Sequence, residues 1–127
     1  MLNWFEAENY CRASGGHLAS FQSKDTLNFI SLSQQLSTKT KGFWIGFNIL
    51  DKDRGFQWSD DSSPTFSNWN LNQPDNYNNI EECAEIRSNQ GWNDINCYHN
   101  RGWICKIPRG ITPTTNPVVN QTFEGKI

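Results

Sequence analysis

The chain has 127 residues, which is enough for one domain and too few for two independent hydrophobic cores. Its 11 Lys and Arg residues against 13 Asp and Glu give a net charge of −2, and no basic cluster is present, so we expect no nucleic-acid partner. No apolar run approaches the roughly 18–20 residues of a membrane span, and no basic-then-apolar leader opens the chain, so we expect no direct membrane insertion.

A first helix is predicted over residues 4–14. Apolar and small side chains recur there at helical spacing, at Trp4, Ala7, Cys11 and Ser14. Asn3 can cap the start of this helix, and Gly15-Gly16 can end it. His17 follows, and we expect it to pack in the core or to bond a loop rather than to bind a metal.

A second helix is predicted over residues 24–36, after a start signal at Ser23. The apolar residues that support it are Leu27, Phe29, Ile30, Leu32 and Leu36. The next apolar segment, 43–47, is a short run of β-formers that predicts a buried strand. Residues 56–58 alternate like a strand after a turn at 51–55.

The second half of the chain is dominated by an irregular stretch. Residues 59–79 are rich in Asn, Asp, Ser and Pro and show little periodicity, and a loop of this length inside a compact domain is unusual unless it is functional. Segments 83–87 and 102–107 are predicted to be the closing strands. Trp58 and Trp69 are expected to support the core and the loop.

Four cysteines suit two disulfides made in an oxidising compartment; they are Cys11, Cys83, Cys97 and Cys105. A zinc site is the rival interpretation. It is disfavoured because the chain has no CxxC pair, and because His17 and His99 lack ligand spacing. The sequence alone leaves three possible disulfide pairings open.

Residues 69–94 gather oxygen-bearing side chains around one proline and one cysteine. The candidate metal ligands among them are Gln73, Asp75, Glu81, Asn93 and Asp94. Calcium is a hard cation that takes roughly 6–8 oxygen ligands, so these five could supply most of a shell and leave positions open. Their spare amide donors and carboxylate lone pairs could then bond the hydroxyls of a sugar diol placed on the ion. The stretch therefore predicts calcium-dependent sugar binding.

This stretch resembles the carbohydrate-recognition loop of C-type lectin domains. Gln73-Pro74-Asp75 matches the tripeptide of galactose-type members, Glu81 falls two residues before Cys83 as the family's third ligand does, and Trp92-Asn93-Asp94 matches the family's WND motif. The resemblance covers residues 4–107, and the chain resembles a lectin-like domain of the mannose receptor family. It implies an α+β C-type lectin-like fold with two helices, small antiparallel sheets and a long calcium-binding loop.

The resemblance also implies roles for individual residues. Gln73, Asp75, Glu81, Asn93 and Asp94 would bind Ca2+ and the sugar, and Pro74 would follow a cis peptide bond. Tyr77 would add an aromatic ring that stacks on the apolar face of galactose or N-acetylgalactosamine. Asp53, Asn76 and Glu82 could contribute to an auxiliary metal site. The implied disulfides are Cys11–Cys105, which ties the first helix to the last strand, and Cys83–Cys97.

Family members begin with a strand that precedes the first helix, whereas this chain starts at that helix. We therefore expect residues 1–107 to be an N-terminally truncated lectin-like domain in which strand 102–107 has an open edge. Residues 108–127 have the composition of a Pro/Thr-rich linker or tail, with a glycosylation acceptor at Asn120-Gln121-Thr122. The chain is then a fragment of a larger extracellular or cell-surface receptor.

Two other functions compete with sugar binding. Glu81 and Asp94 could be imagined as a glycosidase pair, but both are needed as metal ligands, and no Ser–His–Asp arrangement or phosphate loop is present, so no enzyme is expected. The stronger competitor is a protein-binding module of an endocytic receptor that binds no sugar. The expected partners are therefore glycans or glycoproteins, with a protein ligand as the alternative.

Overall fold

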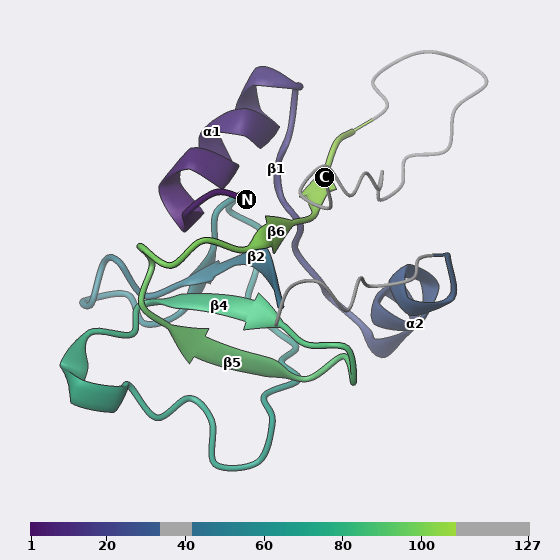
Figure 1. Cartoon of the computed structure of the whole chain (residues 1–127). Coiled ribbons are helices and arrows are strands. Elements are labelled where there is room, and N and C mark those ends of the chain that lie inside the picture. Colours follow the sequence, from purple (N-terminus) through teal and green to yellow (C-terminus); the bar gives the residue numbers. More distant parts are fainter. Residues whose placement is uncertain (34–41, 109–127) are drawn as a thin grey trace.

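The central element of the fold is strand β2 (Phe43–Asn48), which is buried on both faces. The computed structural model describes residues 1–33 and 42–108, drawn in colour in Figure 1. Because successive side chains of a strand point to opposite faces, Phe43, Ile45 and Phe47 enter one core cluster and Trp44 enters the other. This two-sided burial explains why the segment reads as a continuous apolar run rather than as an alternating one.

Four further strands surround β2 in the larger sheet. It pairs in antiparallel fashion with β3 (Gln57–Trp58) and β4 (Cys83–Ile86), and in parallel with β6 (Gly102–Trp103). Strand β5 (Trp92–Ile95) pairs with β4 as an antiparallel hairpin at the edge of this sheet. A separate two-stranded sheet joins β1 (His17–Leu18) to β7 (Cys105–Lys106).

Helix α1 (Trp4–Ala13) has well-defined signals at both ends. Asn3 and Glu6 form a reciprocal capping box, in which the Asn3 side chain accepts from the Glu6 N–H and the Glu6 side chain accepts from the Asn3 N–H. After the last turn, the Gly16 N–H bonds the Cys11 carbonyl, and Gly15 takes a φ of +98°, a conformation that glycine adopts readily. The predicted helix at 4–14 is therefore confirmed to within one residue.

Side chains of α1 pack against the larger sheet. Trp4, Ala7 and Cys11 share a core cluster with Trp44, and the Trp4 indole N–H bonds the Ile45 carbonyl at 2.9 Å. Cys11 is joined to Cys105, which ties α1 to β7, and Cys83 is joined to Cys97. This is the pairing that the family resemblance implies.

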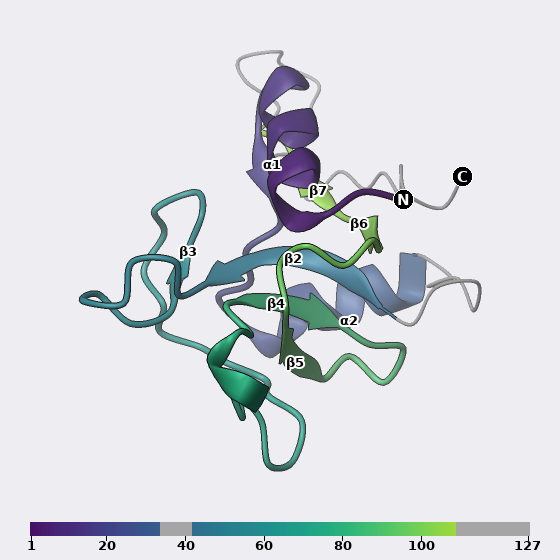
Figure 2. The same ribbon diagram turned by 60° about the vertical axis from the view of Figure 1, so that its left-hand side comes forward.

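Helix α2 (Lys24–Ser33) starts where the sequence predicts, and Leu27 from its first half is buried in the cluster that contains Phe43. The remainder of the predicted helix, residues 34–36, lies outside the described residues. In Figures 1 and 2, α1 and the long loop 59–82 lie on opposite sides of the larger sheet, and α2 lies beside one end of that sheet. No helix among the described residues is both long and apolar enough to cross a membrane.

The α+β class with two helices and small sheets is confirmed, but three strand predictions need correction. The sequence analysis missed β1 and β5, and it joined β6 and β7 into one strand. The chain changes sheets at Ile104, whose N–H bonds the Trp44 carbonyl and whose carbonyl accepts from Ala19. Strands of two to four residues carry too little alternation for a sequence to reveal, since their position depends on such tertiary pairings.

One antiparallel bridge joins the N-terminal segment to the segment before β6: Leu2 and Arg101 exchange backbone hydrogen bonds of 3.1 and 2.9 Å. Strand β7 has β1 as its only sheet partner in the described ranges, which leaves its other edge without a strand there. The predicted tail beyond Pro108 lies outside the described residues.

Candidate metal and ligand site

The long loop takes its shape from asparagine residues with left-handed backbone conformations. Asn72, Asn76, Asn78 and Asn79 all have positive φ, between 45° and 67°. Asparagine tolerates this region better than other residues that carry a side chain. Asn78 and Asn79 belong to a 3-10 turn, η1 (Tyr77–Asn79), and the Gln73–Pro74 peptide bond is cis. These asparagines shape the loop, as turn-forming residues do, whereas the candidate ligands lie between and after them.

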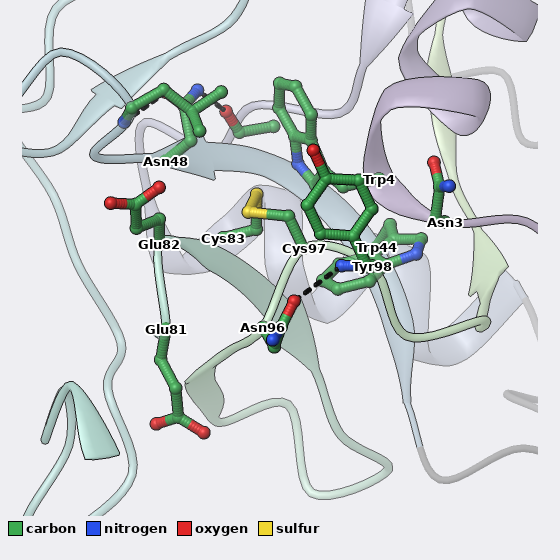
Figure 3. Close-up of a disulfide and its surroundings, with 12 residues drawn as sticks. Asn3, Trp4, Trp44, Asn48, Glu81, Glu82, Cys83, Asn96, Cys97 and Tyr98 are labelled. Carbon is green, nitrogen blue, oxygen red and sulfur yellow. Dashed lines mark hydrogen bonds between the residues drawn. A yellow bond between two sulfur atoms is a disulfide. The ribbon is translucent and has the colours of Figure 1, made fainter. Parts of the chain in front are cut away.

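The β4–β5 hairpin supplies the rigid side of the site. Glu81 precedes β4, and Asn93 and Asp94 belong to β5, the strand that pairs with β4 in the hairpin. The disulfide between Cys83 and Cys97 anchors both strands close to the site. In Figure 3, Glu81 and Glu82 point in opposite directions just before Cys83, so only Glu81 is directed toward the long loop.

Three carboxylates come together where the loop meets the hairpin. Oxygen atoms of Asp75, Glu81 and Asp94 lie within 4.8 Å of one another. Backbone N–H groups hold two of them in place: Asp94 accepts from Asp75 at 3.0 Å and from Asn76 at 2.7 Å, and Glu81 accepts from Tyr77 at 3.1 Å. The loop is therefore fastened to the acidic side chains of the hairpin through its own backbone.

The proximity of these acids changes their pKa values. Burial, together with the hydrogen bond to Asp75 and the nearby negative charges, raises the pKa of Glu81 to about 7. Burial also raises the pKa of Asp94, while the hydrogen bond from Glu81 lowers the pKa of Asp75. Without a cation, the cluster therefore keeps a proton on Glu81 near neutral pH, because three adjacent negative charges repel one another.

An amide oxygen in the same place is buried without a partner. Gln73 Oε1 has no hydrogen bond to any of the described residues, although a buried polar atom normally has one. Asn93 adds a second amide, which contacts the Asn70 amide at 2.9 Å. Three carboxylates and an unsatisfied amide oxygen are the donor set that a hard cation such as Ca2+ prefers. The residues present therefore fit a calcium ion.

All six predicted metal- or sugar-binding residues line one pocket of about 300 Å³; they are Gln73, Asp75, Tyr77, Glu81, Asn93 and Asp94. Tyr77 is 65% exposed at its rim. Five further residues that the sequence analysis did not select line the same pocket: Glu85, Arg87, Ile95, His99 and Arg101. The alternation of β4 could have placed Arg87 on the face of Glu85, but no sequence signal connects either residue to Arg101.

The candidate auxiliary residues have other contacts. Glu82 forms an ion pair with Lys52 at 3.0 Å, and the Asn76 side-chain oxygen accepts from the Glu81 N–H at 3.2 Å. The Asp53 N–H bonds the Asp51 side chain within a turn. The auxiliary metal site stays a prediction.

His17 and the two tryptophans have structural positions. His17 Nδ1 lies 2.6 Å from Glu8 Oε2, so this histidine bonds a buried carboxylate. Trp58 is buried in the core beside Phe47, and Trp69 packs against the same cluster from the start of the loop.

Comparison with known proteins agrees with this geometry. The family model of the lectin C-type domain matches residues 1–107. The chain belongs to the C-type lectin domain family. It is 38% identical over 112 residues to the alpha-N-acetylgalactosamine-specific lectin of Patiria pectinifera, covering 80% of this chain and 66% of that lectin. It is 35% identical over 106 residues to C-type mannose receptor 2 of Homo sapiens, covering 82% of this chain and 7% of the receptor.

Among solved structures, this lectin domain resembles the carbohydrate-recognition domain of cow CD23, determined in the presence of a GlcNAc2Man3 oligosaccharide. The TM-score is 0.72 and the identity 29%, over 81% of this chain and 78% of that one. Lectin domains of this family and fold are non-enzymatic carbohydrate-binding modules, so the domain is not an enzyme. The chain spans under two thirds of the P. pectinifera lectin and a small part of the mannose receptor.

Proposed function

We propose that this lectin domain binds carbohydrate through a calcium ion and prefers galactose or N-acetylgalactosamine. The observation that carries the proposal is the group of three carboxylates that face one another beside the unbonded Gln73 oxygen. An arrangement of this kind is unfavourable until a cation neutralises it. Calcium would therefore both order the loop and complete the sugar site.

The ligands would come from both sides of the pocket. Gln73 and Asp75 approach from the loop, and Glu81, Asn93 and Asp94 from the hairpin. Five side chains leave part of a shell of roughly 6–8 oxygens free, which two vicinal hydroxyl groups can fill. Carboxylate oxygens can accept hydrogen bonds from the same hydroxyls, and the amide NH2 groups can donate to them.

The galactose preference rests on the order of amide and acid in the loop. The Gln73 amide can donate hydrogen bonds to a sugar hydroxyl, whereas the ionised Asp75 carboxylate can only accept them. Exchanging the amide and the acid would therefore reverse which hydroxyl of the diol donates and which accepts, and the net charge of the site would not change. The similar lectin of P. pectinifera is named as specific for alpha-N-acetylgalactosamine, which agrees with this order. Tyr77, exposed at the pocket rim, is positioned to stack on the apolar face of the sugar.

Binding of the full chain to immobilised galactose and mannose, in calcium and in EDTA, tests the proposal. The wild type should retain galactose only in calcium. The double variant Gln73→Glu with Asp75→Asn keeps the charge and the number of ligands, so it should still bind calcium but shift toward mannose. A mismatched buried polar group costs about 1–3 kcal/mol, enough for such a shift. Retention of neither sugar by a calcium-loaded wild type would refute the proposal.

In that event a protein-binding module is the second candidate. A groove of about 410 Å³ lies beside the candidate site, where Leu50, Ile80 and Tyr98 are exposed and the rings of Phe5 and Tyr98 are in contact. Exposed apolar side chains around such a groove are typical of protein contact surfaces. Either function suits an extracellular or cell-surface location within a larger receptor, since two disulfides form in oxidising compartments.

A further inference from the structure

The pocket has a second, basic half that the candidate calcium ligands do not use. This basic half is built on the face of the β4–β5 hairpin that carries Asn93, because Glu85 lies directly across from Asn93. Arg87 follows Glu85 by two positions, so its side chain leaves the same face of the strand. Arg101 reaches this face from the segment that precedes β6.

Glu85 holds the two arginines together. Its side chain is only 1% exposed; Oε2 accepts from Arg87 Nε at 2.7 Å, and Oε1 accepts from Arg101 Nε at 2.8 Å. Two guanidinium groups and one carboxylate leave one net positive charge. Because the carboxylate is buried between them, both arginines are fixed in place rather than extended into solvent.

The two guanidinium groups keep donors for a ligand. Each has five N–H donors in a planar fork, and Glu85 takes only the Nε donor of each. Arg101 Nη1 donates to the Asn100 carbonyl at 2.9 Å. Among the described contacts, this leaves the N–H donors of Arg101 Nη2 and Arg87 Nη1, and one N–H of Arg87 Nη2, whose other N–H can donate to Asn93. The Arg87 side chain is 36% exposed and that of Arg101 is 15% exposed, so a ligand can reach both.

The basic half is continuous with the candidate calcium site. Arg87, Arg101 and His99 line the same pocket as Asp75, Glu81 and Asp94. One terminal atom of the Asn93 amide lies 3.3 Å from Arg87 Nη2 and accepts from it when that atom is the oxygen. Arg87 thus touches a candidate calcium ligand, and a sugar on the ion would lie next to the guanidinium.

We propose that Arg87 and Arg101 form a subsite for an oxyanion carried by the bound sugar, a sulfate or a carboxylate. This inference rests on the proposed function, because the diol of the same sugar would occupy the calcium ion. Guanidinium groups bind such oxyanions with two parallel hydrogen bonds, which strengthens and orients the contact. Calcium is needed first, since the carboxylates in the same pocket would otherwise repel the anion.

The subsite suits a charge placed away from the diol. A sulfate on O6 of galactose, or the carboxylate of galacturonic acid, leaves the 3,4-diol free for the ion. A sulfate on O3 occupies an oxygen of that diol. The proposed binding of the diol to the ion therefore separates the two positions: a charge at C6 should strengthen binding, and the same charge at C3 should weaken it.

The test is inhibition of galactose binding by the full chain in calcium. The inhibitors are methyl galactoside, its 6-sulfate, its 3-sulfate and methyl galacturonide. We expect the 6-sulfate, the uronide or both to inhibit on the order of tenfold more strongly than the neutral sugar, as a charge-assisted hydrogen bond in a partly exposed site would give. A gain by only one of them identifies its group as the ligand. The gain should shrink as salt is raised.

Variants of Arg87 test whether its guanidinium group causes the stronger inhibition by the charged sugars. In Arg87→Gln the ratio of 6-sulfate to neutral inhibition should fall toward one. Arg54→Gln, the same change at an exposed turn away from the pocket, should keep the full ratio. If the glutamine variant does not fold, Arg87→Lys decides. Lysine keeps the charge but loses the planar fork, so an intermediate ratio supports the subsite and an unchanged ratio overturns it.

The outcomes separate the two proposals. Galactose binding without any gain from either charged group overturns the subsite and leaves the proposed function standing. A gain that survives Arg87→Gln also overturns the subsite. No binding of neutral or charged sugar by the calcium-loaded chain removes both.

Discussion

Two groups of carboxylates in this domain have opposite surroundings. Glu8, on helix α1 and only 5% exposed, is fully paired: it accepts from Arg12 at 2.9 Å, from the Leu18 N–H at 2.9 Å and from Ser59 at 3.0 Å, and it lies 2.6 Å from His17. Glu81 and Asp94 accept hydrogen bonds from backbone N–H groups, but their oxygens and those of Asp75 also face one another within 4.8 Å.

The comparison shows how the surroundings of a carboxylate indicate its role. A buried carboxylate with paired lone pairs stabilises the fold and has no need of an ion. Carboxylates that are close to one another destabilise the calcium-free protein and hold a proton, as the raised pKa of Glu81 indicates. The same residue type is thus structural in α1 and a candidate ligand in the loop. Substitutions by glutamine at both places can separate these roles.

The largest effect should come from removing calcium. A calcium ion that binds only the folded domain should, at a free concentration 100-fold above Kd, add about 2.7 kcal/mol to the free energy of unfolding. Glu81→Gln should lose this increment while remaining as stable as the wild type in EDTA, because the change relieves repulsion. Urea unfolding with calcium and with EDTA measures both. Glu82→Gln is the matched control and should keep the increment, since Glu82 pairs with Lys52. Loss of the calcium increment in Glu82→Gln would instead indicate an ion at the auxiliary site.

Glu8→Gln should have the opposite signature. Replacing this buried, charge-paired carboxylate should reduce the free energy of unfolding by about 2 kcal/mol, the scale of hydrogen bonds to charged groups. The reduction should be equal in calcium and in EDTA, because Glu8 lies outside the pocket. A variant as stable as the wild type would show that the network around Glu8 contributes nothing.

Acidification should remove the calcium increment. The pKa of Glu81 is raised from its ordinary value of 4.5 to about 7 in the calcium-free domain. Between pH 4.5 and about 7, Glu81 is protonated in the folded chain but ionised in the unfolded chain. Protonation of Glu81 therefore stabilises the calcium-free domain at low pH, and this stabilisation is lost as pH rises through about 7. Calcium competes with that proton and should bind less tightly as pH falls.

Melting temperatures from pH 8 to pH 5, with calcium and with EDTA, test this coupling. The difference between the two curves should be largest above pH 7 and should narrow steadily below it. A difference that stays constant across this range would contradict a protonated Glu81.

The smallest effect is expected at Tyr77, which is exposed and should affect the ligand but not the fold. Tyr77→Ala should weaken galactose binding by about 1 kcal/mol through loss of a stacking surface, with the free energy of unfolding unchanged. Tyr98→Ala is the matched control, because Tyr98 is also exposed but contacts Phe5 outside the candidate pocket. Equal weakening by both variants would show that neither ring stacks on the sugar.

The candidate ligands could be selected from the sequence because they lie close together in the chain and are of one chemical kind. Gln73 and Asp75 flank Pro74, Glu81 lies two residues before Cys83, and the other two ligands belong to the WND motif. The helices were also predictable, since the Asn3–Glu6 capping box and the apolar spacing of α1 are local features. Strands β1 and β5 were missed because short strands are defined by their partners.

The sequence by itself therefore determined the first helix, the even number of cysteines and the residue types that could bind calcium. Only the tertiary structure decided which partners the buried carboxylates bond: the Ser59 hydroxyl reaches Glu8 across 51 positions, and Arg101 reaches Glu85 across 16. It also placed Arg87 and Arg101 in the pocket of the candidate ligands. The physical reason is that charge pairing depends on distances of about 3 Å, which folding sets between residues that are far apart in the chain.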